Sequence, residues 1–177
     1  RGQADYGQLN ELDINDLLAR EPSVADEGLL QSQVIDQVIM VTGAGGSIGS
    51  ELCRQILQRK PKILLLFDLS EFALYTLYNE LQKTLHQLSQ EERVGFSKEQ
   101  SQSRGSVNNS GNDDLVTRIV PLLGSITNKN RVNDVISTWR PNIIYHAAAI
   151  KHVPIAEQNI KECVETNVFG TLVMAKV

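Results

Sequence analysis

Four glycines stand close together in the stretch VTGAGGSIGS, residues 41–50. Because glycine disfavours the interior of both helices and strands, such a cluster indicates either a positive φ or a backbone that another group must approach closely. Gly43, Gly46 and Gly49 are spaced three residues apart, between an apolar run and a helical pattern. This arrangement predicts a strand–turn–helix unit whose backbone amides bind a phosphate group. The alternative interpretation is a glycine-rich connection without a ligand.

Each glycine of this spacing has its own predicted role. Gly43 would make the tight turn, Gly46 would let a pyrophosphate approach the backbone, and Gly49 would let the helix pack close to the strand. The spacing is not G-x-G-x-x-G, because the third glycine of that pattern would fall on Ile48. Gly-x-x-Gly-x-x-Gly is typical of the short-chain dehydrogenase/reductase version of the dinucleotide-binding fold.

An acidic residue follows at the distance that such a site requires. Asp68 ends the apolar run KILLLFD and lies 19 residues beyond Gly49. A carboxylate there can accept both ribose hydroxyls of NAD and would repel the 2′-phosphate of NADP, so the pattern favours NAD. The alternatives are a solvated residue at the strand end or the N-cap of the next helix.

The elements that must position these residues alternate along the chain. Apolar runs predict buried strands, and amphipathic patterns predict helices between them. The predicted strands are 38–42, 62–68, 117–126 and 142–149, and the helices are 47–59, 70–88, 128–141 and 154–177. Strands that are apolar on both faces and alternate with helices predict an α/β, doubly wound parallel sheet. Right-handed crossovers make it Rossmann-like with strand order 3-2-1-4.

The rest of the chain divides around this domain. Residues 1–36 are predicted to be a linker or surface wrap, with a short helix between Asp13 and Pro22. Residues 37–177 are predicted to form a dinucleotide-binding domain that is incomplete at its C-terminus. Within it, residues 87–114 are rich in Gln, Ser, Asn and charge, which predicts a disordered insertion, with a functional lid as the alternative.

Composition excludes several classes of function. The 177 residues are 41% hydrophobic and 21% charged, which is ordinary for a globular domain. The net charge of −4 does not indicate the basic surface that binds nucleic acid or an anionic membrane. Cys53 and Cys163 are interpreted as reduced, buried thiols rather than a disulfide or a metal site. No signal peptide or membrane span is visible. The chain starts at Arg1 and stops at Val177 inside a helical pattern, so we expect it to be a piece of a longer protein.

Five stretches together resemble the nucleoside-diphosphate-sugar 4,6-dehydratases of the bacterial polysaccharide biosynthesis family, which are extended short-chain dehydrogenases/reductases. The resemblance covers nearly everything from Asp13 to Val177 except the polar insertion, and the H-A-A-A-x-K-H-V-P phrase is its most specific part. The stretches are LDINDLLAREP, VTGAGGSIGSELCRQIL, LLLFDLSEFALY, LGSITN and PNIIYHAAAIKHVPIAEQNIKECVETNVFGTLVMA.

The resemblance implies roles for residues along the cofactor. Ser47 and Ile48, with the glycine loop, would hold the pyrophosphate. Ser125 and Ile126, after the third strand, occupy the place where related enzymes often have an acidic residue near adenine. Because this chain has a serine there, the adenine contact is the less specific part of the resemblance.

Further roles follow at the end of the fourth strand. Ala147, Ala148 and Ala149 would press against the cofactor, and Lys151 and His152 would meet a sugar diphosphate at the mouth of the site. The alternative for these last two is a solvated lysine and a histidine that caps the next helix. Asn167 resembles the helix asparagine that supports the active site in this superfamily.

The implied function is the NAD-binding part of an enzyme that acts on UDP-N-acetylglucosamine or a similar sugar. The reaction oxidises C4 with NAD, eliminates water across C5–C6 and returns the hydride to C6. The superfamily's Tyr-x-x-x-Lys pair belongs to strand 5 and its helix and is not in this chain, so we expect a fold truncated before strand 5 and no turnover by the chain alone.

Two alternatives stay open. One is a nucleotide-sugar epimerase or reductase on the same scaffold, and the other is a non-catalytic NAD-binding module. The resemblance further implies a homo-oligomeric parent and a cytoplasmic site for this segment, which itself makes no membrane contact. Upstream helices in many relatives allow an inner-membrane anchor in the parent.

Overall fold

Four parallel strands form one sheet in the computed structural model, which describes residues 26–100 and 117–177. The strands are β1 (Val38–Thr42), β2 (Ile63–Asp68), β3 (Arg118–Leu123) and β4 (Ile143–His146). The helices are α2 (Glu27–Val34), α3 (Ser47–Gln58), α4 (Glu71–Gln100), α5 (Lys129–Trp139), α6 (Val153–Gln158), α7 (Ile160–Val164), the π-helical η2 (Glu165–Gly170) and α8 (Thr171–Lys176).

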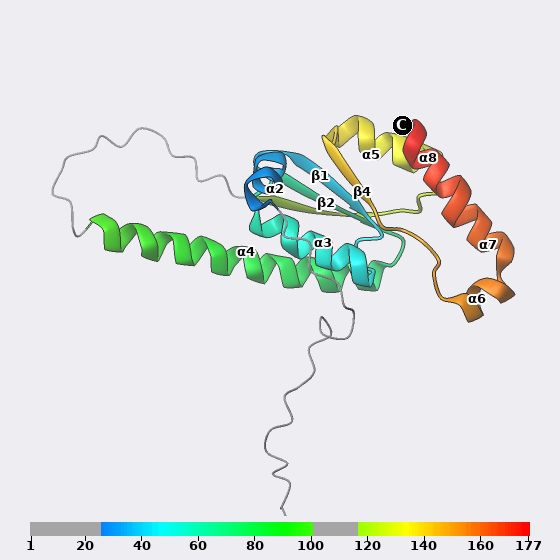
Figure 1. Cartoon of the computed structure of the whole chain (residues 1–177), viewed down its shortest axis with the longest axis horizontal. Helices are drawn as coiled ribbons and strands as arrows, with labels where there is room; N and C mark the ends of the chain where they lie inside the picture. The colour runs from blue at the N-terminus through cyan, green and yellow to red at the C-terminus, as the bar shows by residue number, and fades with distance from the viewer. Residues whose placement is uncertain (1–25, 101–116) are drawn as a thin grey trace, which may run out of the picture.

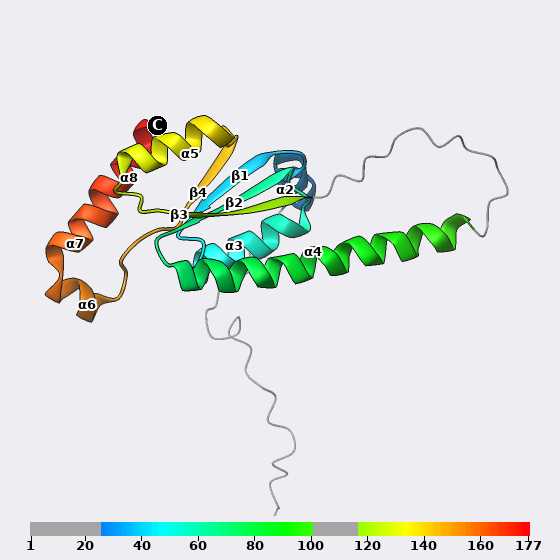
Figure 2. The same ribbon diagram turned by 180° about the vertical axis from the view of Figure 1, so that it is seen from behind.

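The strand order is β3-β2-β1-β4, which confirms the predicted doubly wound topology. Every pairing is parallel, and the register places Thr42 beside Phe67 on one side and His146 on the other. Helices α3 and α4 cover one face of the sheet, while α5 and α8 lie over the other (Figures 1 and 2). The carboxyl ends of all four strands therefore meet at one edge of the sheet, where ligands bind in open α/β folds.

The two central strands explain why helices are needed on both faces. Alternate residues of β1 and β2 point to opposite sides, so an uninterrupted apolar run fills two separate cores. One core packs the strands against α3, α4 and the end of α2; its strand residues are Ile39, Val41, Leu64, Leu66 and Ile119. The other packs Met40, Leu65 and Phe67 against α5 and α8.

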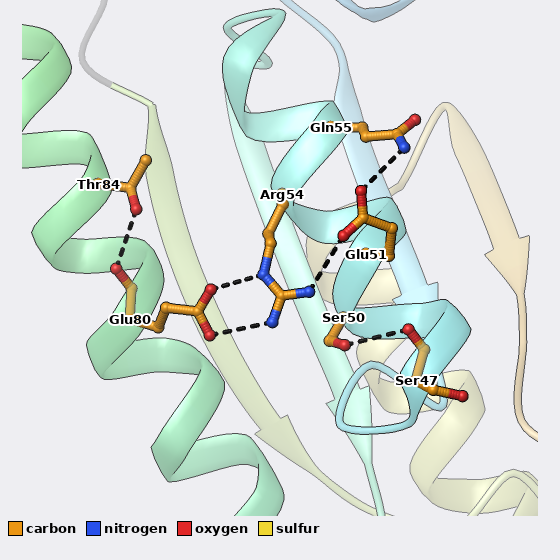
Figure 3. Close-up of polar contacts among 7 residues, drawn as sticks. All are labelled: Ser47, Ser50, Glu51, Arg54, Gln55, Glu80 and Thr84. Carbon is orange, nitrogen blue, oxygen red and sulfur yellow. Dashed lines mark hydrogen bonds and ion pairs between the residues drawn. The ribbon is translucent and has the colours of Figure 1, made fainter. Parts of the chain in front are cut away.

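An ion-pair network joins the two helices on the first face (Figure 3). Arg54 of α3 donates from Nε and Nη2 to the two carboxylate oxygens of Glu80 on α4, at 2.6 and 3.1 Å. It also donates to Glu51, which in turn accepts a hydrogen bond from Gln55. Because both partners of the Arg54–Glu80 pair are about two-fifths exposed, the network orients the helices more than it stabilises them.

The segment before the sheet contains a helix where the sequence predicts a linker or surface wrap. Asp26 caps α2 by accepting a hydrogen bond from the amide of Leu29 at 3.0 Å, and Glu27 pairs with Arg59 at 2.8 Å. Val34, at the end of α2, is 2% exposed and belongs to the first core. The predicted helix between Asp13 and Pro22 lies outside the described residues.

Helix α4 extends to Gln100, so residues 87–100 are helical where the sequence predicts the start of a disordered insertion. The physical reason is that Gln, Glu, Lys and Arg are good helix formers, and continuing an existing helix needs no new nucleus. The far half of α4 projects past the sheet (Figures 1 and 2). The remaining residues of the predicted insertion, 101–114, lie outside the described part of the chain.

The single long helix predicted from Pro154 is divided. Helix α6 ends at Gln158, and the backbone of its C-cap residue Asn159 leaves the helical region with φ −136° and ψ 49°. Asn159 then supports both neighbouring elements: its side-chain amide donates to the carbonyl of Ile155, and its own carbonyl accepts from the amide of Cys163. Helices α7 and α8 continue through the π-helical turn η2, which contains Asn167.

Candidate functional site

A pocket of about 400 Å³ opens along the carboxyl ends of the strands. Its lining comes from the loops after all four strands, with further contributions from α4 and η2. The lining residues are Gly43, Gly45, Gly46, Phe67, Asp68, Leu69, Ser70, Ala73, Gly124, Ser125, Ile126, Ala147, Ala148, Ala149, Ile150 and Thr166. Most of the predicted site residues are thus brought together, although they come from segments more than 100 residues apart.

The three predicted glycines occupy three different environments. Gly43 has a φ of +65°, and a Cβ there would lie 2.7 Å from the backbone of Ala148. A Cβ at Gly49 would lie 2.0 Å from the carbonyl oxygen of Gly43, so helix α3 packs directly on the turn. A Cβ at Gly46 would come no closer than 3.2 Å to a protein atom. The turn and the close helix packing thus have a structural cause, whereas Gly46 is the least crowded of the three: beyond its chain neighbours and its own helix, the carbonyl oxygen of Gly43 is the one atom of the described residues within 4 Å of a Cβ there.

The start of α3, next to Gly46, has amides that no side chain caps. Gly46 is the N-cap and supplies no side chain, so no side-chain acceptor satisfies the first turn. The first amides of a helix have no partner within the helix and attract anions. Ile48 is 62% exposed, and neither it nor Ser47 or Gly49 lines the pocket. Their predicted contact with a pyrophosphate stays a prediction.

Asp68 lines the pocket at the end of β2, and the protein backbone holds both of its oxygens. Oδ2 accepts a hydrogen bond from the amide of Gly45 at 2.9 Å, and Oδ1 accepts one from the amide of Ser70 at 2.8 Å. Each carboxylate oxygen has a further lone pair with which to accept a ligand hydroxyl. The alternative role as a helix cap falls to Ser70, whose hydroxyl oxygen accepts the amide of Ala73.

Sequence reasoning left Gly45 without a role. A Cβ on this residue would lie 2.4 Å from the Cβ of Ala73 and 3.3 Å from Oδ2 of Asp68. The absence of a side chain at Gly45 therefore lets the glycine loop approach α4 and donate its amide to the carboxylate. The doublet Gly45-Gly46 was the only signal in the sequence.

The loop after β3 contributes Ser125 and Ile126, as predicted. The strand ends at Leu123, three residues before the predicted end. The hydroxyl oxygen of Ser125 accepts the amide of Thr127 at 3.2 Å and lies 2.8 Å from the hydroxyl of Thr127. Ile126 is 5% exposed and packs against Gly170, where a Cβ would lie 2.6 Å from it. Ser125 is therefore the polar group of this wall, and Ile126 joins it to the core.

The loop after β4 begins earlier than predicted, because the strand ends at His146. Ala147, Ala148 and Ala149 all line the pocket, and their small side chains leave its volume open. Asn167 holds the next residue: its Oδ1 accepts the amide of Ile150 and its Nδ2 donates to the carbonyl of Ile150, both at 2.9 Å. These two hydrogen bonds join η2 to the loop after β4, and the supporting role of Asn167 stays a prediction.

Lys151 and His152 do not line the pocket. Nζ of Lys151 donates to the hydroxyl oxygen of Ser47 at 2.8 Å, which joins the β4 loop to the start of α3. His152 is the N-cap residue of α6 but makes no side-chain capping bond. The predicted contact of these two residues with a sugar diphosphate stays a prediction.

The two cysteines differ in environment. Cys53, in α3, is fully buried, and burial raises the pKa of its thiol to about 12. Cys163, in α7, is half-buried, and both thiols are free. In residues 26–100 and 117–177, no cluster of histidine, cysteine and carboxylate side chains is suited to a metal ion. No helix in these same ranges combines the length and apolarity that a bilayer crossing demands.

Comparison with known proteins identifies the family. The family described as polysaccharide biosynthesis protein matches residues 39–98 and 94–177. This chain belongs to that family. It is 33% identical over 170 residues to the capsular polysaccharide biosynthesis protein CapD of Staphylococcus aureus, an alignment that covers 96% of this chain and 24% of the relative. The chain thus spans about a quarter of the length of that relative.

Two further similarities are more limited. A segment of 49 residues, 28% of this chain and 14% of the relative, is 39% identical to a UDP-N-acetylglucosamine 4,6-dehydratase (inverting) of Campylobacter jejuni. The crystal structure of UDP-glucose-4-epimerase from Stenotrophomonas maltophila, with bound NAD and formylated UDP-arabinopyranose, superposes with a TM-score of 0.53. That match covers 79% of this chain and 32% of the epimerase chain at 14% identity, and it shows a shared fold.

Proposed function

We propose that this chain is the NAD-binding part of a nucleotide-sugar 4,6-dehydratase in surface polysaccharide or glycan biosynthesis. The observation that carries this proposal is the placement of Gly43, Gly46 and Asp68 around one pocket at the carboxyl ends of the strands. In the order β3-β2-β1-β4, strands β2 and β3 are added on one side of β1 and β4 on the other, so the topological switch point lies between β1 and β4. That switch point is where open α/β sheets bind their ligands.

The residues present fit a dinucleotide. The pocket volume of about 400 Å³ lies within the usual range of ligand sites. The bare backbone at Gly46, which lines the pocket, and the amides at the start of α3 suit a pyrophosphate, and a Cβ at Gly46 would intrude on it. Asp68 would accept the ribose hydroxyls, and Ser125 would lie near the base. NAD, when bound, would accept a hydride from the sugar and later return it.

Family membership and the segment similar to a dehydratase support the choice of substrate. We infer that the substrate is UDP-N-acetylglucosamine or a similar nucleotide sugar. Lys151 would contact the diphosphate of this nucleotide sugar, because its ammonium already lies beside the glycine loop, where it donates a hydrogen bond to Ser47. His152, the next residue, would contact the same group. The protein containing this chain would work as a homo-oligomer on the cytoplasmic side, with any membrane anchor outside this segment.

Calorimetry with NAD and NADP tests the cofactor. We expect NAD to bind at least about tenfold more tightly, because the 2′-phosphate of NADP would face the Asp68 carboxylate, and tenfold corresponds to about 1.4 kcal/mol. The Asp68→Ala variant should narrow this ratio. The ratio of the two affinities is informative because the loss of the hydrogen bonds from Asp68 to Gly45 and Ser70 would weaken the binding of NAD and of NADP alike.

The control for this experiment is Asp134→Ala, which removes an exposed carboxylate from α5, away from the pocket lining. It should leave both affinities unchanged. Equal or tighter binding of NADP by the wild-type chain would contradict the assignment of Asp68. Failure of both dinucleotides to bind would overturn the proposed cofactor altogether.

Mass spectrometry tests the reaction. The full-length protein, incubated with UDP-N-acetylglucosamine, should form a 4-keto-6-deoxy sugar that has lost one water. An epimerase on the same scaffold would instead give a product of unchanged mass. The chain of residues 1–177 alone should form neither product, even with NAD, because it contains no Tyr-x-x-x-Lys pair.

A further inference from the structure

We propose that His146 is a positioning residue for the pocket: through Thr171 and Asn167 it holds the segment Ala147–Ile150, which forms the wall beside β4. The assignment rests on the proposed function in one respect only, namely that this wall faces a dinucleotide. The geometry that carries it is a continuous chain of hydrogen bonds from β1 to the pocket wall.

His146 is the last residue of β4 and lies beside Thr42 of β1. Its Nδ1 is 2.7 Å from the hydroxyl oxygen of Thr42, and its Nε2 is 3.1 Å from the hydroxyl oxygen of Thr171. Thr42 is fully buried, whereas Thr171 begins α8. The imidazole therefore bridges the centre of the sheet and the helix that packs over its other face.

The directions of these hydrogen bonds follow from the number of available protons. The hydroxyl of Thr171 donates its single proton to the carbonyl of Asn167 at 2.8 Å, so toward His146 its oxygen can only accept. Nε2 must then carry a proton. Partial burial lowers the pKa of His146, which favours the neutral ring, and the hydroxyl of Thr42 donates to the bare Nδ1. One tautomer of His146 satisfies every member of the chain.

The last link reaches the pocket. Asn167 lies in the π-helical turn η2, and its side chain holds both backbone groups of Ile150. The three alanines before Ile150 have no polar side chain with which to fix the loop. Their placement depends on the bond from the amide of Ala147 to the carbonyl of Thr42 at one end and on Asn167 at the other.

A small shift of this segment would change the pocket. The backbone of Ala148 lies where a Cβ on Gly43 would be only 2.7 Å away, so the alanine segment touches the glycine turn. With Asp68 on the β2 side, the second nucleotide of a dinucleotide would lie toward β4. Loosening the wall should therefore weaken a dinucleotide more than a mononucleotide.

Replacement of Thr171 tests the proposal without touching the pocket lining. Thr171→Val keeps the shape of the side chain but removes both of its hydrogen bonds, whereas Thr171→Ser keeps the hydroxyl. Thr84→Val is the matched control, since Thr84 makes the same hydrogen bond to a helix carbonyl four residues earlier, in α4. Affinities for NAD and AMP and the hydrogen exchange of the Ile150 amide are measured for all three variants and the wild type.

We expect Thr171→Val to bind NAD about tenfold more weakly, to bind AMP within about twofold of wild type, and to exchange the Ile150 amide faster. Thr171→Ser and Thr84→Val should match the wild type. The Ile150 amide should exchange more slowly in His146→Gln than in His146→Ala, because the glutamine side chain can still donate a hydrogen bond to Thr171. Nitrogen NMR shifts should show the proton of His146 on Nε2.

The positioning role would be overturned if Thr171→Val exchanged the Ile150 amide at the wild-type rate and kept the wild-type ratio of NAD affinity to AMP affinity. Equal weakening of NAD and AMP would also overturn it, because that result indicates a general loss of structure. If the wild-type chain binds no NAD, the proposed cofactor fails. The exchange of Ile150 and the tautomer of His146 would still decide whether the positioning chain exists.

Discussion

Gly49→Ala should destabilise the chain strongly although it adds a single methyl group. The new Cβ would lie 2.0 Å from the carbonyl oxygen of Gly43, 2.7 Å from its carbonyl carbon and 2.9 Å from Cα of Ala44. All three are backbone atoms, so no side chain can turn away. Because ordinary contact begins near 3.4 Å, α3 and the turn after β1 would have to separate by about 1.4 Å.

The expected loss can be estimated from opposing effects. Alanine favours a helix over glycine by about 1 kcal/mol, but overpacking a dense site costs about 1–3 kcal/mol, and more when backbone must move. Moving α3 also weakens the packing of Cys53, Ile56 and Leu57 in the first core. We therefore expect the free energy of unfolding to fall by about 3 kcal/mol. For a chain of this length, that lowers Tm by about 6–12 °C.

Gly46→Ala is the matched comparison on the same loop. Its Cβ would be 3.2 Å from the same carbonyl oxygen, and alanine is a clearly poorer N-cap than glycine, so stability should fall by about 1 kcal/mol. NAD affinity should nevertheless drop at least about tenfold, since the methyl group would occupy the space proposed for the pyrophosphate. Urea unfolding followed by circular dichroism, together with calorimetry, measures both effects. A Gly49→Ala chain as stable as the wild type would refute the reasoning from close backbone contact.

Three further outcomes are expected. A thiol reagent at neutral pH should leave Cys53 unmodified until the chain unfolds, because burial raises the pKa of its thiol to about 12. The half-buried Cys163 should react first, and prompt labelling of Cys53 would contradict its burial. Acidification below pH 6.5 should lower the free energy of unfolding, because the pKa of His146 is lower in the folded chain and the unfolded chain therefore binds a proton first. Urea titrations at several pH values measure this effect. The free energy of unfolding of His146→Gln should depend less on pH than that of the wild type. A double-mutant cycle with Arg54→Met and Glu80→Gln should give a coupling free energy of about 0.5–1 kcal/mol, which high salt reduces, because both side chains are partly solvated. A coupling free energy above about 2 kcal/mol would show a stronger ion pair than this exposure allows.

Much of the fold could be predicted from local patterns. Apolar runs bounded by turns marked all four strands, and right-handed crossovers then left the order β3-β2-β1-β4. The first strand, Val38–Thr42, has the predicted bounds. Such agreement is expected where each segment's own hydrophobic pattern decides its structure, as it does in a sheet that is buried on both faces.

Other features were beyond local patterns. The polar sequence after residue 87 resembles a disordered tract by composition, yet α4 simply continues through residues 87–100. The break at Asn159 and the π-helical turn η2 lie inside a pattern that predicts one helix. In η2 the side chain of Asn167 bonds the backbone of Ile150, 17 residues away, and no local pattern encodes such a contact.

The candidate site divides in the same way. Gly43, Gly46 and Asp68 could be identified from the sequence because their spacing reflects one strand–turn–helix unit and the strand after it. The bonds of Lys151 to Ser47 and of His146 to Thr42 each join residues 104 positions apart, and no local pattern encodes such pairs. The sequence by itself therefore determined which residues are the candidates for binding a phosphate and a ribose. Only the tertiary structure decided how the wall beside β4 is held, because that wall consists of small residues fixed by hydrogen bonds from distant elements.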